Sequence, residues 1–89
     1  MRITAEISLY PLREDFVSAI RDFIERLRAE AGIEVVTNQM STQVRGEFDD
    51  VMPAVTACIK KSMAANDRVV FVTKFLNAGL DIGRTPDLE

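Results

Sequence analysis

The hydrophobic period of this sequence switches between two and about 3.6 residues, and the order of these switches limits the folds that the chain can adopt. Alternating apolar and polar side chains indicate a strand, whereas apolar residues three or four positions apart indicate a helix. The patterns follow one another as strand, helix, strand, strand, helix and strand. In chain order, they cover residues 2–10, 14–31, 33–39, 40–46, 49–65 and 68–75.

Three residues support these bounds. Pro11 ends the first strand because proline has no N–H group to donate to a neighbouring strand. Gly32 occupies a position where a left-handed residue ends the first helix. Pro53 is compatible with a helix start near residues 48–50, because the amides of a first turn have no acceptor within the helix. The few residues between the second and third strands predict a tight antiparallel hairpin.

This order predicts an α+β fold, the ferredoxin-like β-α-β-β-α-β sandwich, with a four-stranded antiparallel sheet and two helices on one face. The first and third strands then lie in the centre of the sheet. We expect one ferredoxin-like domain over residues 1–78. Residues 79–89 have no periodicity and are expected to form a C-terminal loop or a partly disordered tail.

The sequence lacks histidine and has one cysteine, which restricts the chemistry that it can perform. Without histidine there is no Ser-His or Cys-His pair, and the commonest general base and metal ligand are missing. Cys58 lies in an apolar helical pattern, so we expect a small core residue rather than a nucleophile. We therefore expect no enzyme, no metal site and no cofactor. The alternative is an enzyme in which Glu6 or Asp49 acts as a base.

The charge and the apolar segments indicate the surroundings of the chain. Its net charge is −3 and its Lys and Arg residues are scattered, whereas nucleic-acid binding needs a basic stripe. No apolar run approaches the roughly twenty residues of a membrane span, and the N-terminus begins with a strand pattern rather than a signal peptide. A single cysteine fits a reducing compartment. We expect a cytoplasmic protein that binds neither nucleic acid nor a membrane.

One face of the predicted sheet is free of helices, and its side chains are polar. The residues expected on this open face are Thr4, Glu6, Ser8 and Tyr10 from the first strand, and Ser41, Gln43 and Arg45 from the third. This assignment requires Val44 and Met40 to face the helices. The pattern is compatible both with an ordinary solvated face and with the wall of a binding site.

The last strand is apolar on both faces, because Val69, Phe71 and Phe75 alternate with Val70 and Val72. An edge strand of this composition is not expected to remain in water. We therefore expect a homodimer or homotetramer whose sheets pack or extend through this strand.

Three segments, in this order, carry a resemblance to a known family. They are ISLYPL (residues 7–12), MSTQVRGEFDDV (residues 40–51) and RVVFVTKF (residues 68–75). The chain resembles the YkoF-like family and the related single-domain thiamine-binding proteins over about residues 4–79. The resemblance implies a ferredoxin-like fold, oligomers made through the sheets, and binding of thiamine or its hydroxymethylpyrimidine moiety without turnover, in vitamin uptake or salvage. A homodimer of this chain would stand in for the two repeats that some members carry in one chain.

The resemblance also implies a set of binding residues. By position, Ser8 and Tyr10 match the first-strand motif, and Ser41 and Thr42 match the third-strand motif. Glu6 and Asn38 are added on chemical grounds, because a carboxylate and an amide can hydrogen-bond an aminopyrimidine.

Neighbouring residues of a strand point to opposite faces, so Ser41 and Thr42 can serve one ligand only at the hairpin end of the central strands. The site is therefore expected at that end of the sheet. The alternative function is a ferredoxin-like regulatory or protein-interaction module, because the fold alone does not determine function.

Overall fold

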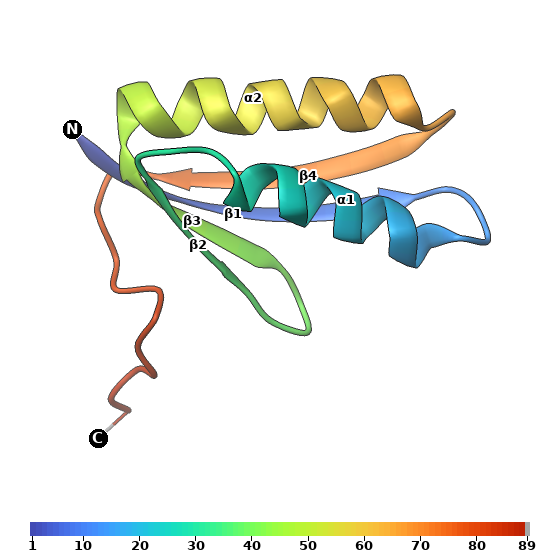
Figure 1. Cartoon of the computed structure of the whole chain (residues 1–89). Coiled ribbons are helices and arrows are strands. Elements are labelled where there is room, and N and C mark those ends of the chain that lie inside the picture. The colour runs from blue at the N-terminus through green and yellow to red at the C-terminus, as the bar shows by residue number, and fades with distance from the viewer. Residues whose placement is uncertain (89) are drawn as a thin grey trace.

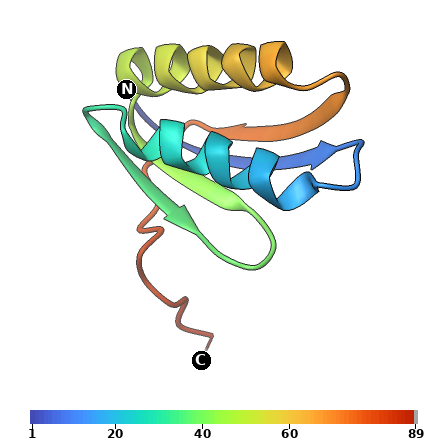
Figure 2. The same cartoon turned by 45° about the vertical axis from the view of Figure 1, so that its right-hand side comes forward.

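The six predicted elements follow one another in a computed structural model that describes residues 1–88 (Figure 1). They are β1 (Arg2–Pro11), α1 (Phe16–Arg28), β2 (Ile33–Thr37), β3 (Thr42–Glu47), α2 (Phe48–Ala65) and β4 (Val69–Leu76). All strand pairs are antiparallel and the strand order is β2-β3-β1-β4. Both helices lie on one face of the sheet (Figures 1 and 2). The ferredoxin-like fold and the central positions of β1 and β3 are therefore confirmed.

The core lies between the sheet and the two helices. Side chains alternate along β1, so Ile3, Ala5, Ile7 and Leu9 all point to the helices and are at most 8% exposed. The buried residues of α1 recur every four positions, at Ala19, Phe23 and Leu27. The centroid of the Phe23 ring lies 5.2 Å from the centroid of the Phe71 ring on β4. These contacts hold α1 over the middle of the sheet.

Two glycines, Gly32 and Gly46, allow the turn before β2 to pack closely against the start of α2. Gly32 has a φ of +81°, which is a left-handed conformation that glycine adopts without strain. A Cβ atom on Gly46 would lie 3.1 Å from the carbonyl oxygen of Gly32 and 3.3 Å from Cγ2 of Val51. The left-handed conformation predicted for Gly32 is confirmed, but it precedes β2 instead of ending α1.

The helix bounds differ in detail from the predicted ones. The helix α1 ends at Arg28, and its last turn tightens, because the Glu30 amide donates to the Leu27 carbonyl at 3.2 Å. The helix α2 begins within the predicted region, at Phe48, but this places Pro53 in the second turn and not in the first. The carbonyl of Asp49 thus loses its helical partner, and it lies on an exposed turn where water can reach it.

The segment after β4 packs on one end of the open face. The Thr4 hydroxyl donates to the Ala78 carbonyl at 2.7 Å and accepts from the Leu80 amide at 2.9 Å. Arg45 donates through Nη1 to the Leu80 carbonyl at 2.9 Å and through Nη2 contacts Glu34 Oε2 at 2.6 Å. Thr4 therefore lies on the open face as predicted, but residues 78–80 cover it and it is 7% exposed.

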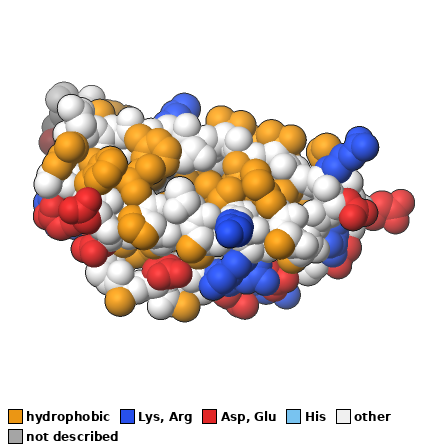
Figure 3. Space-filling view, turned by 90° about the horizontal axis from the view of Figure 1, so that it is seen from above, with side chains coloured by type: hydrophobic (Ala, Val, Ile, Leu, Met, Phe, Trp, Pro, Cys, Tyr) orange, Lys and Arg blue, Asp and Glu red, His pale blue; other side chains and the backbone are white. Residues whose placement is uncertain are grey.

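The helix side of the molecule carries charges of both signs among hydrophobic side chains, without a broad basic area on this face (Figure 3). Neither helix of the described chain has the length and apolarity that crossing a bilayer requires.

Candidate functional site at the hairpin end of the central strands

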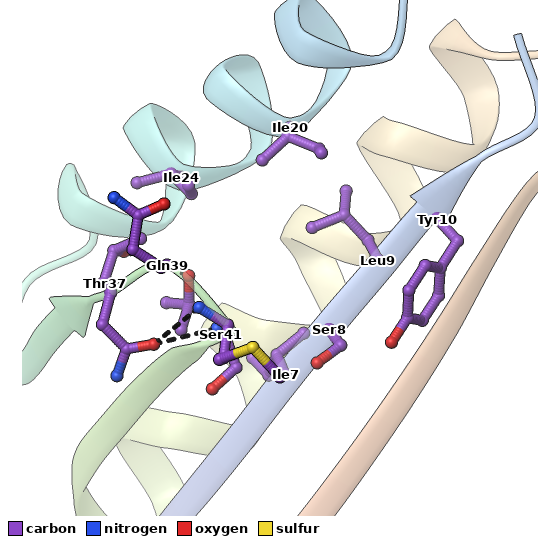
Figure 4. A pocket seen from close by; sticks show the side chains of 12 residues that line it. Ile7, Ser8, Leu9, Tyr10, Ile20, Ile24, Thr37, Gln39 and Ser41 are labelled. Carbon is purple, nitrogen blue, oxygen red and sulfur yellow. Dashed lines mark hydrogen bonds between the residues drawn. The ribbon is translucent and has the colours of Figure 1, made fainter.

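A pocket of about 120 Å³ lies where the β2–β3 hairpin diverges from β1 (Figure 4). It is lined by residues 7–10 of β1, by Ile20 and Ile24 of α1, and by residues 37–42 of the hairpin. We call it the hairpin pocket. Ile20, Ile24 and Leu9 lie on its helix side, whereas Ser8 and Tyr10 point to the other side of β1 (Figure 4). The pocket therefore has an apolar side and a polar side.

The pocket exists because β1 is longer than its partner β3. The pairs between these strands end at Ile7–Thr42, whereas β1 pairs with β4 as far as Pro11–Val69. From Ser8 onward, β1 therefore pairs with a strand on one side only in the part of the chain that the structure describes. The hairpin loop leaves the sheet at this point, and α1 covers the gap from the helix side.

The main chain of Leu9 points into this gap. In an antiparallel sheet, the N–H and C=O groups of successive residues point to alternate sides of the strand. The Met1 carbonyl accepts from the Phe48 amide on the β3 side, and the Leu12 amide donates to the Arg68 carbonyl on the β4 side. Odd-numbered residues of β1 therefore face the β3 side. Leu9 presents one N–H donor and one C=O acceptor there, beyond the last β3 pair.

Asn38 shapes the hairpin loop. Its Oδ1 accepts from the amides of Met40 at 2.9 Å and Ser41 at 3.1 Å, and its own amide donates to the Ser41 carbonyl at 3.0 Å. β3 begins only at Thr42, so Met40 lies in the loop and is 85% exposed. The expectation that Met40 packs against the helices was therefore wrong, whereas Val44 is fully buried as predicted.

The polar side of the pocket continues into a hydrogen-bonded cluster on the open face. The Ser41 hydroxyl donates to Glu6 Oε2 at 3.2 Å and accepts from Gln43 Nε2 at 2.8 Å. Glu6 Oε1 lies 3.5 Å from the Lys74 ammonium of β4. Asn38 Nδ2 donates to Gln43 Oε1 at 3.5 Å. These contacts link the hairpin loop to three neighbouring strands.

Thr42 lies on the other side of the strand from Ser41. It is 3% exposed, and its hydroxyl is 3.0 Å from the hydroxyl of Thr37 on β2. Ser41 and Thr42 both line the pocket, which lies at the hairpin end where the sequence places the candidate site. It gathers Ser8, Tyr10, Asn38, Ser41 and Thr42. Glu6 is not part of its lining and reaches it only through Ser41.

Cys58 lies away from this pocket, on the side of α2 that faces the core, and is fully buried as predicted. Burial raises the pKa of its thiol, and the nearby Glu30 carboxylate raises it further. Within residues 1–88, His, Cys, Asp and Glu side chains do not gather in threes as metal ligands.

Comparison with known proteins identifies the chain's relatives. Residues 2–79 match the YKOF-related family. The chain belongs to this family. No functionally curated protein matches the sequence.

Solved structures share the fold of this YKOF-related protein. A hypothetical protein from Methanocaldococcus jannaschii is 28% identical, with a TM-score of 0.74, 86% of this chain covered and 80% of the other. A Thermotoga maritima protein described as a candidate for thiamine biosynthesis or salvage is 23% identical, with a TM-score of 0.79 and coverages of 92% and 91%. A Streptococcus pneumoniae protein is 21% identical, with the same TM-score of 0.79 and the same coverages of 92% and 91%.

Several groups that line the pocket of this YKOF-related protein could not be predicted as binding groups from its sequence. Ile20 and Ile24 are spaced like any buried pair on a helix, and their pattern carries no sign of a ligand. The main-chain groups of Leu9 on the β3 side, which have no partner within residues 1–88, have no side-chain signature at all. A weak signal was available in the lengths of the predicted strands, because residues 2–10 outrun residues 40–46 and must lack a partner at one end.

Proposed function

We propose that this YKOF-related protein binds thiamine or its hydroxymethylpyrimidine moiety without turnover, in vitamin uptake or salvage. The observation that carries the proposal is the free edge of β1 at Leu9, which offers a donor and an acceptor side by side in the hairpin pocket. An aminopyrimidine has a complementary edge, because its exocyclic amine donates and the adjacent ring nitrogen accepts. Two parallel hydrogen bonds would then orient the ring.

The size and the lining of the pocket support one ring as the bound group. An apolar cavity of about 150 Å³ is known to hold benzene, and the hairpin pocket has a volume of about 120 Å³ with an open mouth. Ile20 and Ile24 offer an apolar side against which a pyrimidine can pack. The thiazolium ring of thiamine would lie at the mouth, where Tyr10 is 55% exposed and can face a cation with its ring.

Family membership and a relative support the choice of ligand. The Thermotoga maritima protein described as a candidate for thiamine biosynthesis or salvage has the same fold over 92% of this chain. Binding without turnover is proposed because the pocket offers hydroxyl and amide groups, and the whole sequence contains no histidine to act as a general base near neutral pH.

A second proposal concerns self-association. In the described chain, β4 pairs only with β1, so its other edge carries the unpaired main-chain groups of an eight-residue strand. Val70 is 46% exposed and Val72 is 49% exposed on the open face. We propose that the protein forms a homodimer or homotetramer through this edge and its apolar side chains. The same surface would serve the alternative function, that of a protein-interaction module. Equilibrium sedimentation tests this, and a monomer at micromolar concentration would exclude it.

Titration calorimetry with hydroxymethylpyrimidine and with thiamine tests the binding proposal. Both ligands are expected to bind, and Ser41→Ala is expected to weaken both, because it removes a pocket hydroxyl. Ser18→Ala makes the same chemical change on α1, outside the pocket, and should bind as the wild type does. If neither ligand gives heat at millimolar concentration, the proposal is ruled out.

A further inference from the structure

In the hydrogen-bonded cluster beside the hairpin pocket, the donor and the acceptor of each hydrogen bond are fixed. The cluster consists of Asn38, Gln43, Ser41, Glu6 and Lys74, and we call it the polar relay. A hydroxyl or an amide can normally turn to donate or to accept, so its neighbours decide which it does. The Asn38 side chain on the loop side and the Glu6 carboxylate on the strand side have no such choice, and they set the direction of the hydrogen bonds between them.

The loop end of the relay is fixed by the main chain. Asn38 Oδ1 accepts from the amides of Met40 and Ser41, so Asn38 Nδ2 is left to donate, and it donates to Gln43 Oε1 at 3.5 Å. This orients the Gln43 amide. Its Nε2 therefore faces Ser41 and donates to the Ser41 hydroxyl oxygen at 2.8 Å.

The strand end of the relay is fixed by charge. An ionised carboxylate only accepts hydrogen bonds, and Glu6 has the Lys74 ammonium 3.5 Å from its Oε1. Its Oε2 accepts a hydrogen bond from the Ser41 hydroxyl, with 3.2 Å between the two oxygens. Because a hydroxyl has one proton and two lone pairs, Ser41 has no proton left for a ligand. It keeps one lone pair free.

We propose that the polar relay makes Ser41 an acceptor toward the pocket, so that the site selects rings bearing an amine over the same rings bearing a carbonyl. A ring amine can donate to the free lone pair, whereas a carbonyl oxygen would oppose one lone pair with another. Glu6 is then a positioning residue that acts through Ser41 and does not touch the ligand. This inference rests on the proposed binding of a pyrimidine in the hairpin pocket, and it adds the basis of the ligand's selection.

The test compares two ligands that differ at one position. These are 4-amino-5-hydroxymethyl-2-methylpyrimidine and the same ring with a 4-oxo group, each titrated calorimetrically into the full-length protein. The wild type is expected to bind the amino ring on the order of tenfold or more tightly, because a mismatched polar pair in a site is strongly disfavoured. Glu6→Gln is expected to reduce this ratio by about threefold or more, because a glutamine can also donate to Ser41 and lets the hydroxyl turn; the Leu9 carbonyl, which the substitution leaves in place, keeps the remaining preference.

Two further variants test whether a change in the affinity ratio comes from the hydrogen bond between Glu6 and Ser41 or from a change of charge alone. Glu25→Gln makes the same charge change on the exposed part of α1 and should keep the wild-type ratio. Lys74→Met leaves Glu6 as an acceptor and should also keep the ratio. Thermal unfolding of each variant confirms that the comparison is made on folded protein.

Each outcome supports or overturns the inference. Equal affinity of the wild type for the two rings, or an unchanged ratio in folded Glu6→Gln, overturns the relay and leaves pyrimidine binding in place. Binding of neither ring overturns the proposed function and the relay together.

Discussion

The two hydroxyls beneath the hairpin pocket, those of Thr37 and Thr42, should be coupled in stability. They lie 3.0 Å apart across the β2–β3 pair that closes the hairpin. Thr42→Val keeps the shape of the side chain and removes this hydrogen bond. A neutral hydrogen bond contributes about 0.5–1.5 kcal/mol to stability, and a buried group left without its partner costs about 1–3 kcal/mol.

The geometry places the cost near the lower end of these ranges. Thr42 is 3% exposed, but Thr37 is only half-buried, so water can reach the hydroxyl that loses its partner. We expect Thr42→Val to reduce the free energy of unfolding by about 1 kcal/mol. For a domain of this size, that is a fall of about 4–8 °C in Tm.

Urea unfolding of the two single variants and of the double variant Thr37→Val with Thr42→Val measures the coupling. The double variant replaces both hydroxyls by methyl groups, so its loss should be smaller than the sum of the single losses by about 1 kcal/mol. Additive losses would refute the hydrogen bond as the source of the stability. A loss of ligand affinity far larger than the loss of stability would assign Thr42 a direct contact with the ligand.

Three further predictions concern the rest of the fold. Phe23→Ala removes a fully buried ring and should cost about 3–5 kcal/mol in urea unfolding; a cost below about 1 kcal/mol would contradict the packing. Thr4→Val should speed hydrogen exchange of the Leu80 amide, whereas Thr4→Ser should leave it slow. The Ser18 hydrogen bond lowers the pKa of Asp15, so its stabilising effect is present at neutral pH and fades as the pH falls through that lowered pKa. Ser18→Ala should raise this pKa in an NMR titration.

The sequence predicts the fold well because its signals are local. The alternation along β1 places Ile3 to Leu9 in the core, and the four-residue spacing of α1 does the same for Phe23. Both patterns depend only on neighbours in the chain. The order of the elements then leaves few ways to cover one face of one sheet.

The errors come from contacts that alternation along a strand does not show, one of them far apart in sequence and one within the hairpin loop. Thr4 lies on the open face by alternation, yet residues 78–80 cover it, and nothing near Thr4 in sequence indicates this. Met40 continues the alternation of β3, but the strand pairs begin only at Thr42 because Asn38 folds the loop before it. The unequal lengths of β1 and β3, which open the pocket, likewise follow from register.

A pocket lies where the sequence places the candidate site, but the chemistry of its lining was not predictable. The opposite directions of Ser41 and Thr42 place a shared site at the hairpin end, and the pocket lies there. The acceptor role inferred for Ser41 depends on Glu6 and Gln43, whose atoms meet only in the folded sheet. Main-chain groups such as those of Leu9 leave no trace in a residue pattern.

The central claim is that a pyrimidine binds in the hairpin pocket against the free edge of β1. Its most direct test is a titration of hydroxymethylpyrimidine into ¹⁵N-labelled protein, followed through the backbone amide signals. The account predicts that the amide of Leu9 shifts most, together with those of residues 38–41, because the ligand accepts from Leu9 and packs on the loop. It would be contradicted if the largest shifts fell along β4, or if Leu9 did not respond while the ligand bound elsewhere.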